Sequence, residues 1–260
     1  MTVFFIGAGP GDPDLITIKG RDLIRRCQTC LYAGSLVPEA VVAESQAETI
    51  MDTASMTLDD IMSVITTAHA DGHDIARVHS GDPSLYGAIA EQIRRLKTHD
   101  IDYKIIPGVP AYAAAAAEMG IELTIPEVTQ SIILTRTAMK SSPMPEGEEL
   151  ENLARTKATL AIHLSVRNLR EIEQVLAPVY GAECPVVIAY RVGWPDQQFL
   201  YGTLSNIRKK VMEAKITRTA LIFVGRGLNH DDAFRDSALY DKDHVHVLRV
   251  KRGNKDERGE

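Results

Sequence analysis

The sequence predicts an α/β protein made of two α/β domains, and two observations lead to this prediction. In the first half, short runs rich in β-branched residues alternate with segments of helical periodicity, which is typical of a parallel sheet with crossover helices. A second series of such runs begins after Pro126, and the stretch 120–129 separates the two series. We therefore expect an N-terminal α/β domain at 1–124, a C-terminal α/β domain at 125–250 and a mobile charged tail at 251–260.

Two helices of the first half have clear signals at their starts. Apolar residues recur at i, i+3, i+4 and i+7 from Leu58, which predicts a helix at 57–70. Asp82 as N-cap and Pro83 at the first helical position predict a second helix at 83–96.

The other elements of the chain follow from composition and period. The alanine-rich segment 111–119 predicts a tightly packed helix that ends at Gly120. A helix is also expected from Asp14 to about Cys27. We expect strands at 2–6, 75–79, 103–107, 131–135, 159–164, 186–190, 198–202 and 220–225.

Charge and hydropathy exclude several classes of function. The chain has 29 basic and 35 acidic residues, a formal net charge of -6, which opposes nonspecific binding to nucleic acid or anionic lipid. No apolar stretch approaches the roughly 20 residues of a membrane span, and the start has no signal-peptide pattern. We therefore expect a cytoplasmic protein with neither nucleic acid nor membrane as a partner, whose three cysteines stay thiols.

A glycine-rich turn follows the first expected strand. Gly7, Gly9 and Gly11 lie where a dinucleotide-binding fingerprint would lie, but Asp12 replaces the third glycine of that fingerprint and Pro10 removes a backbone donor. Carboxylates at this turn disfavour a pyrophosphate. They suit S-adenosylmethionine, which has no phosphate and carries a sulfonium and an ammonium. A purely structural turn explains the same glycines.

Four segments together resemble the tetrapyrrole methylase family, and their order extends through nearly the whole chain to Gly227. These segments are GAGPGDPDLIT (7–17), SGDPSLYG (80–87), PGVPAYAAAAAEMGIELTIP (107–126) and AYRVGWPDQ (189–197). Within the family, YAGSLV (32–37), the PGVPAY helix and YRVGWPDQ are most similar to members that methylate C-11 of precorrin-4, giving precorrin-5 in cobalamin biosynthesis.

The resemblance implies a fold, a cofactor and a substrate. The expected fold has two α/β domains with the cofactor in the cleft between them, usually in a homodimer. The cofactor is S-adenosyl-L-methionine, with S-adenosyl-L-homocysteine as product, and an anionic tetrapyrrole lies in a trough beside it. The matching positions imply cofactor contacts at Pro10, Ser80, Gly81, Asp82, Leu85, Pro110, Ala111, Leu164, Val192, Thr219 and Ala220.

Candidates for catalysis and substrate binding are fewer. Relatives that methylate uroporphyrinogen carry an aspartate where this chain has Ala33, so their proposed proton acceptor does not transfer to this chain. Tyr112 and Arg191 are the candidates for a catalytic role. Arg136, Lys140 and Arg191 follow expected strand ends and are candidates for pairing with substrate carboxylates, although each also reads as a solvated charge.

Other hypotheses remain open on the sequence. One is methylation of cobalt-precorrin-4, or of another carbon of the macrocycle. A second is a nicotinamide-dependent oxidoreductase, for which the glycine-rich start is the only support. A third is a non-catalytic tetrapyrrole-binding protein. No metal site is predicted, because Cys27 and Cys30 have no second pair of ligands at zinc-site spacing.

Overall fold

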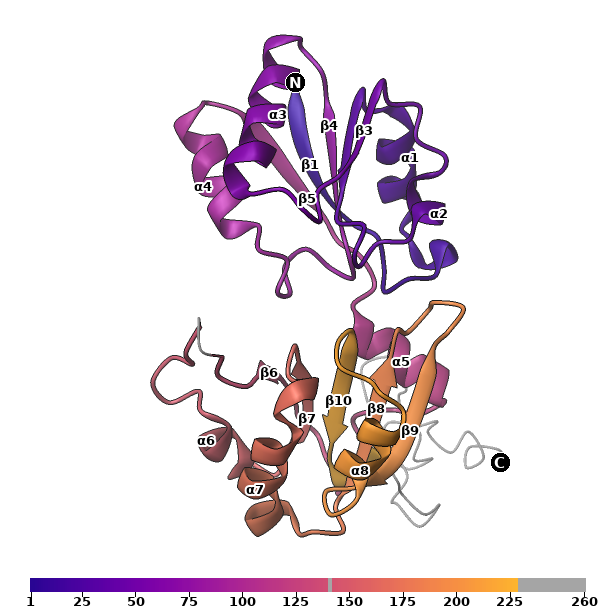
Figure 1. The fold of residues 1–260 in the computed structure, drawn as a ribbon, viewed down its shortest axis with the longest axis vertical. Coiled ribbons are helices and arrows are strands. Elements are labelled where there is room, and N and C mark those ends of the chain that lie inside the picture. The colour runs from indigo at the N-terminus through magenta and orange to yellow at the C-terminus, as the bar shows by residue number, and fades with distance from the viewer. Residues whose placement is uncertain (140–141, 229–260) are drawn as a thin grey trace, which may run out of the picture.

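The computed structural model describes residues 1–139 and 142–228. These residues form two five-stranded sheets, each covered by helices, and the two bodies stack along the long axis of the molecule (Figure 1). We call them the N-terminal lobe and the C-terminal lobe. The predicted α/β architecture with two lobes is confirmed.

The N-terminal lobe has a fully parallel sheet in the order β3-β2-β4-β1-β5. Apolar side chains alternate between its two faces: Phe4 and Ile6 pack with α1 and α2, whereas Val3 and Phe5 pack with α3 and α4. Helices therefore cover both faces (Figure 1). The elements are β1 (Thr2–Gly7), α1 (Ile18–Arg26), β2 (Thr29–Tyr32), α2 (Glu39–Val42), β3 (Thr49–Asp52), α3 (Leu58–Ala70), β4 (Ile75–His79), α4 (Ala90–Thr98) and β5 (Asp102–Ile106).

The helix predicted from Pro83 is wrong at its start, because α4 begins only at Ala90. Asp82 does not cap a helix; its carboxylate accepts hydrogen bonds from the backbone N–H groups of Ser84 and Gly108. Tyr86 and Ala88 have φ of 55° and 50°, which no α-helix allows. The segment between β4 and α4 is therefore a loop.

Two further differences concern short elements. The helix predicted at 14–27 is a 3₁₀ turn, η1 (Pro13–Leu15), followed by α1, whose N-cap Thr17 accepts from the N–H of Gly20. The sequence analysis did not predict β2 and β3 as strands. Each has only four residues, and β3 is exposed throughout, so neither has a period long enough to detect.

The C-terminal lobe has a mixed sheet in the order β6-β7-β10-β8-β9. Only β6 and β7 are parallel; the other neighbours pair antiparallel. One face packs with α6, α7 and α8 and the other with α5. The elements are α5 (Ala111–Met119), β6 (Ile132–Arg136), α6 (Leu150–Ala154), β7 (Thr159–His163), η2 (Val166–Asn168), α7 (Leu169–Tyr180), β8 (Pro185–Tyr190), β9 (Gln198–Thr203), α8 (Ile207–Glu213), β10 (Ala220–Val224) and η3 (Arg226–Leu228).

Helix α5 belongs by its packing to the C-terminal lobe. Ala114 and Ala115 pack in one cluster with Ala161 and Phe223 of the second sheet. The small side chains let the helix lie close to the strands, as the alanine-rich composition predicted. The chain thus leaves the first sheet before Ala111, which favours a domain boundary there; the boundary at 124/125 stays a prediction.

The remaining expectations concern membrane spans, the cysteines and the C-terminal tail. No described helix is long and apolar enough to cross a membrane. All three cysteines are buried free thiols, as predicted. The tail at 251–260 lies outside the described residues.

A substitution in α5 tests its packing on the second sheet. Ala115 is completely buried, so Ala115→Leu overpacks this interface and is expected to lower the free energy of unfolding by about 1–3 kcal/mol. Ala117→Leu, on the exposed side of the same helix, is the control and should change it little. Urea unfolding followed by circular dichroism measures both, and equal stabilities would contradict the packing described here.

Candidate functional site

Three glycines bring three loops into direct backbone contact where the first sheet ends. A Cβ atom on Gly7 would lie 2.5 Å from the backbone N of Gly108 and 2.7 Å from the carbonyl oxygen of Gly81. A Cβ on Gly108 would lie 2.2 Å from that same oxygen. Real Cβ atoms do not approach backbone so closely, so only glycine allows this packing at Gly7 and Gly108.

Hydrogen bonds hold these loops in register. Gly81 donates to the carbonyl oxygen of Gly9 over 2.7 Å, and Gly9 donates back to that of Gly81 over 3.3 Å. Asp82 joins the third loop, because its Oδ2 accepts from the N–H of Gly108 at 3.0 Å. The glycine-rich turn, the end of β4 and the segment before α5 therefore form one rigid rim.

The C-terminal lobe closes on this rim through Trp194. Its indole Nε1 donates a 3.1 Å hydrogen bond to the carbonyl oxygen of Pro10. The guanidinium of Arg191 stacks on the Trp194 ring at 3.9 Å and its Nε pairs with Asp196 Oδ1 at 2.7 Å. Arg191 thereby holds the indole in place, and the indole joins the two lobes.

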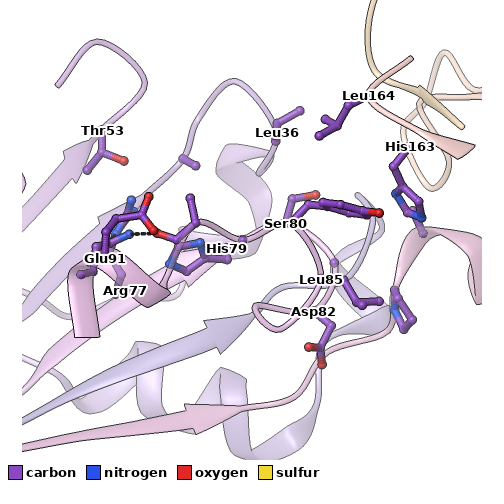
Figure 2. Close-up of a pocket in the computed structure, with 18 of the residues that line it drawn as sticks. Leu36, Thr53, Arg77, His79, Ser80, Asp82, Leu85, Glu91, His163 and Leu164 are labelled. Atoms are coloured by element: carbon purple, nitrogen blue, oxygen red, sulfur yellow. Dashed lines mark hydrogen bonds between the residues drawn. The ribbon is translucent and has the colours of Figure 1, made fainter. Parts of the chain in front are cut away.

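Two adjoining pockets open between the lobes. The larger, which we call the first pocket, has a volume of about 410 Å³, and the second pocket about 190 Å³. Figure 2 shows the first pocket, with residues of the N-terminal lobe along most of its length and His163 and Leu164 at one end. The residues that line both pockets are Leu36, Ser80, Ala111, His163 and Leu164.

All eleven residues that the family resemblance implied as cofactor contacts line these pockets. The first pocket is lined by Ser80, Gly81, Asp82, Leu85, Pro110, Ala111 and Leu164. The second is lined by Pro10, Val192, Thr219 and Ala220, together with Ser80, Ala111 and Leu164. The fold thus brings together residues from both lobes that are up to 210 positions apart in the chain, and their contact with a cofactor stays a prediction.

Strained backbone is concentrated at the same place. Leu164, Arg191 and Thr219 have φ of 57°, 47° and 53° and line the second pocket, and Tyr86 and Ala88 line the first. Left-handed conformations are unfavourable for these residue types, by an amount of order 1–3 kcal/mol each, and persist where the surrounding structure imposes them.

Of the candidates for catalysis and substrate binding that the structure describes, only one lines a pocket. Arg191 lines the second pocket. Tyr112 lines neither pocket and packs against the core beneath α5, and Arg136 lines neither. The Arg136 guanidinium instead donates to the carbonyl oxygens of Thr137, Ser142 and Pro143. Lys140 lies outside the described residues.

The polar residues of the first pocket that the sequence analysis missed include Arg77, His79 and His163. Burial lowers the pKa of His79 to about 3 and that of His163 to about 4, so both imidazoles are neutral at pH 7. Nε2 of each has no hydrogen-bond partner among the described residues. A detectable signal existed, since Arg77 and His79 alternate with apolar residues on a strand that is otherwise apolar.

The local structure disfavours the nicotinamide hypothesis. In a dinucleotide fold, the glycine-rich turn opens directly into a helix whose N-terminus binds the pyrophosphate. Here the turn leads into η1, and α1 begins only at Ile18 with its N-terminus capped by Thr17.

The described residues also contain no cluster of three or more His, Cys, Asp or Glu side chains that could hold a metal ion.

Comparison with known proteins gives near full-length matches. The chain is 55% identical over 249 residues to the precorrin-4 C(11)-methyltransferase of Pseudomonas aeruginosa, covering 96% of this chain and 99% of that protein. It resembles the X-ray structure of the cobalamin biosynthetic enzyme cobalt precorrin-4 methyltransferase, CbiF, with a TM-score of 0.85 and 38% identity over 88% of this chain and 96% of that one.

A more distant solved structure shares the fold alone. The uroporphyrin-III C-methyl transferase of Thermus thermophilus, solved in complex with S-adenyl homocysteine, has a TM-score of 0.73 and 23% identity over 88% of this chain and 94% of that chain. The sequence profile of the tetrapyrrole (corrin/porphyrin) methylases matches residues 2–208. With this profile match over most of its length, and relatives similar from end to end, the chain belongs to the tetrapyrrole (corrin/porphyrin) methylase family.

Proposed function

We propose that this protein transfers a methyl group from S-adenosyl-L-methionine to C-11 of precorrin-4, giving precorrin-5 in cobalamin biosynthesis. The observation that carries the proposal is that eleven residues from both lobes converge on two adjoining pockets at the lobe junction. The precorrin-4 C(11)-methyltransferase of Pseudomonas aeruginosa, similar over its whole length, supports the choice of substrate and of carbon.

The walls of the two pockets suit S-adenosylmethionine. Their predicted contacts are mostly glycine, proline, alanine and other small or apolar residues, so the ligand meets backbone groups rather than fixed charges. Asp82 is the carboxylate among them, and it favours a cationic ligand. A Cβ on Gly81 would meet nothing closer than 3.8 Å, so a side chain there would occupy pocket space.

The chemistry requires little from titratable groups. S-adenosylmethionine supplies a methyl group activated by its positively charged sulfur. The protein has to align the acceptor carbon with that methyl group and exclude water, and positioning of this kind can supply about 7–11 kcal/mol of the barrier reduction. The rigid rim and the Trp194 junction provide such alignment. Position 33, which lines the first pocket, is occupied by alanine and therefore supplies no carboxylate to remove a proton.

A cobalt-containing substrate is the second candidate. It is favoured by the likeness to cobalt precorrin-4 methyltransferase, whose chain is covered almost completely at 38% identity. We further propose a homodimer located in the cytoplasm, which sedimentation analysis and cell fractionation would test.

The decisive experiment locates the transferred methyl group. Purified protein is incubated with methyl-labelled S-adenosylmethionine and either precorrin-4 or its cobalt form, and the product is analysed by NMR. Label at C-11 is expected. Label at another carbon contradicts the proposed position, and absence of label with both macrocycles contradicts the proposed reaction and favours a binding protein without turnover.

Removal of the Asp82 carboxylate tests the cofactor site. Asp82→Ala takes away the acceptor of the Ser84 and Gly108 N–H groups, so we expect a loss of about 2 kcal/mol in the free energy of unfolding. Because the rim also loosens, we expect about tenfold weaker binding of S-adenosylhomocysteine in titration calorimetry. Ser84→Ala keeps its backbone N–H and serves as control. A folded Asp82→Ala protein with the parent's affinity would refute this role.

Replacement of Arg191 tests its assignment to the substrate. If Arg191 pairs with a tetrapyrrole carboxylate, Arg191→Ala should raise the KM for the tetrapyrrole by about tenfold and leave the affinity for S-adenosylhomocysteine unchanged. Asp196→Asn removes the ion pair but keeps the guanidinium, and is the matched control. Weaker cofactor binding with an unchanged tetrapyrrole KM would instead make Arg191 a support for Trp194 alone.

A further inference from the structure

Arg77 is a buried cation with no counter-ion among the described residues. It lies on β4 with 5% of its surface exposed, and its side chain points to the same face of the sheet as Ile75, toward α3 and α4. The ion pairs among residues 1–139 and 142–228 do not include it. Burial lowers its pKa only to about 10, so the guanidinium is charged at neutral pH.

The guanidinium is held in a fixed orientation by Gln92. Nε of Arg77 donates to Oε1 of Gln92 at 3.2 Å, and Nε2 of Gln92 donates to the carbonyl oxygen of Ala88 at 2.9 Å. Nη1 of Arg77 has no hydrogen-bond partner in the described part of the chain. A donor is therefore oriented but unsatisfied, in a residue that lines the first pocket.

The position of Arg77 in that pocket separates it from the predicted cofactor contacts. In the view of Figure 2, Arg77 lies on the same side as Thr53, whereas His163 and Leu164 lie on the opposite side. That opposite side is shared with the second pocket, which Arg77 does not line. The first pocket thus extends from the lobe junction into the N-terminal lobe and reaches Arg77 there.

A buried, unpaired guanidinium is expected to bind an anion. Burying an unpaired ion costs several kcal/mol, and proteins normally offset this cost with a partner of opposite charge. Glu91 also lines the first pocket, yet its side chain forms no ion pair with Arg77. A carboxylate suits a guanidinium best, because both groups are planar and pair through two hydrogen bonds.

Two ligands of the proposed reaction carry carboxylates, and the position of Arg77 favours one of them. The methyl donor has a carboxylate on its amino-acid part, but its predicted contacts cluster at the lobe junction, and a cation beside its sulfonium would be repelled. The tetrapyrrole carries carboxylates around its ring and has to extend away from the donor. Its periphery therefore fits the part of the pocket where Arg77 lies.

We propose that Arg77 binds one carboxylate side chain of the tetrapyrrole, with Gln92 as the residue that positions the guanidinium. This inference rests on the proposed function and adds a specificity-determining contact to it. Arg77 therefore contributes to the orientation of the macrocycle, and hence to which carbon faces the methyl donor.

The first test compares Arg77→Gln, Arg77→Lys and Arg94→Gln. Arg94, on α4, is exposed and lines neither pocket, so Arg94→Gln removes one positive charge as a matched control. With precorrin-4 varied at saturating donor, Arg77→Gln should raise the tetrapyrrole KM at least tenfold with a small change in kcat. The tetrapyrrole KM of Arg77→Lys should lie between those of the parent and Arg77→Gln, because lysine keeps the charge but cannot form the two parallel hydrogen bonds of a guanidinium. Calorimetry should find S-adenosylhomocysteine bound equally well by all variants.

Gln92→Glu distinguishes an anion site from a structural role. It gives Arg77 an internal carboxylate, so we expect a melting temperature no lower than the parent's together with a raised tetrapyrrole KM. It also keeps the inference testable if Arg77→Gln does not fold. A Gln92→Glu protein with the parent's tetrapyrrole KM would overturn the proposal.

Two other outcomes are equally informative. A folded Arg77→Gln protein with unchanged tetrapyrrole KM, or with loss confined to S-adenosylhomocysteine binding, would overturn the proposal. If the parent methylates no precorrin-4, the proposed function fails, and fluorescence titration with uroporphyrin III, a stable tetrapyrrole with carboxylate side chains, still decides on Arg77. Weaker binding by Arg77→Gln than by the parent and by Arg94→Gln supports the anion site, and equal affinities overturn it.

Discussion

The site depends on one steric constraint, the backbone contact between the loops that contain Gly7, Gly81 and Gly108. Because no side-chain atom separates these loops, the ends of β1 and β4 lie against the segment that leads into α5. Helix α5 in turn packs on the second sheet, so the same contact sets where the C-terminal lobe begins. The pockets exist because the two lobes meet at this rim.

Strained backbone lies at the lobe junction, and an unpaired charge lies further into the N-terminal lobe. Residues such as Leu164 and Thr219, which line the second pocket, adopt left-handed backbone next to strand ends. Arg77 has no ion-pair partner among residues 1–139 and 142–228, although the chain has more acidic than basic residues. Such features lower stability, and they are expected where a protein is shaped for a ligand rather than for its own core.

The chemistry that follows is mainly positioning. The predicted cofactor contacts are mostly small or apolar residues, and the imidazoles of His79 and His163 in the first pocket are neutral at pH 7. This composition suits the transfer of an activated methyl group to an electron-rich carbon, because alignment of the reactants and exclusion of water lower the activation barrier of such a transfer. In the proposed arrangement, the charges serve to orient an anionic macrocycle.

The sequence by itself determined the two-lobe α/β architecture, most strands and the glycine-rich turn after the first strand, because hydrophobic period and turn residues are local signals. Family resemblance named the eleven positions that the fold brings to the pockets. Only the tertiary structure decided that α5 packs with the second lobe, that Asp82 joins two loops instead of capping a helix, and that Nη1 of Arg77 has no hydrogen-bond partner among the described residues. Each of these depends on which distant residues come into contact, and no local pattern contains that information.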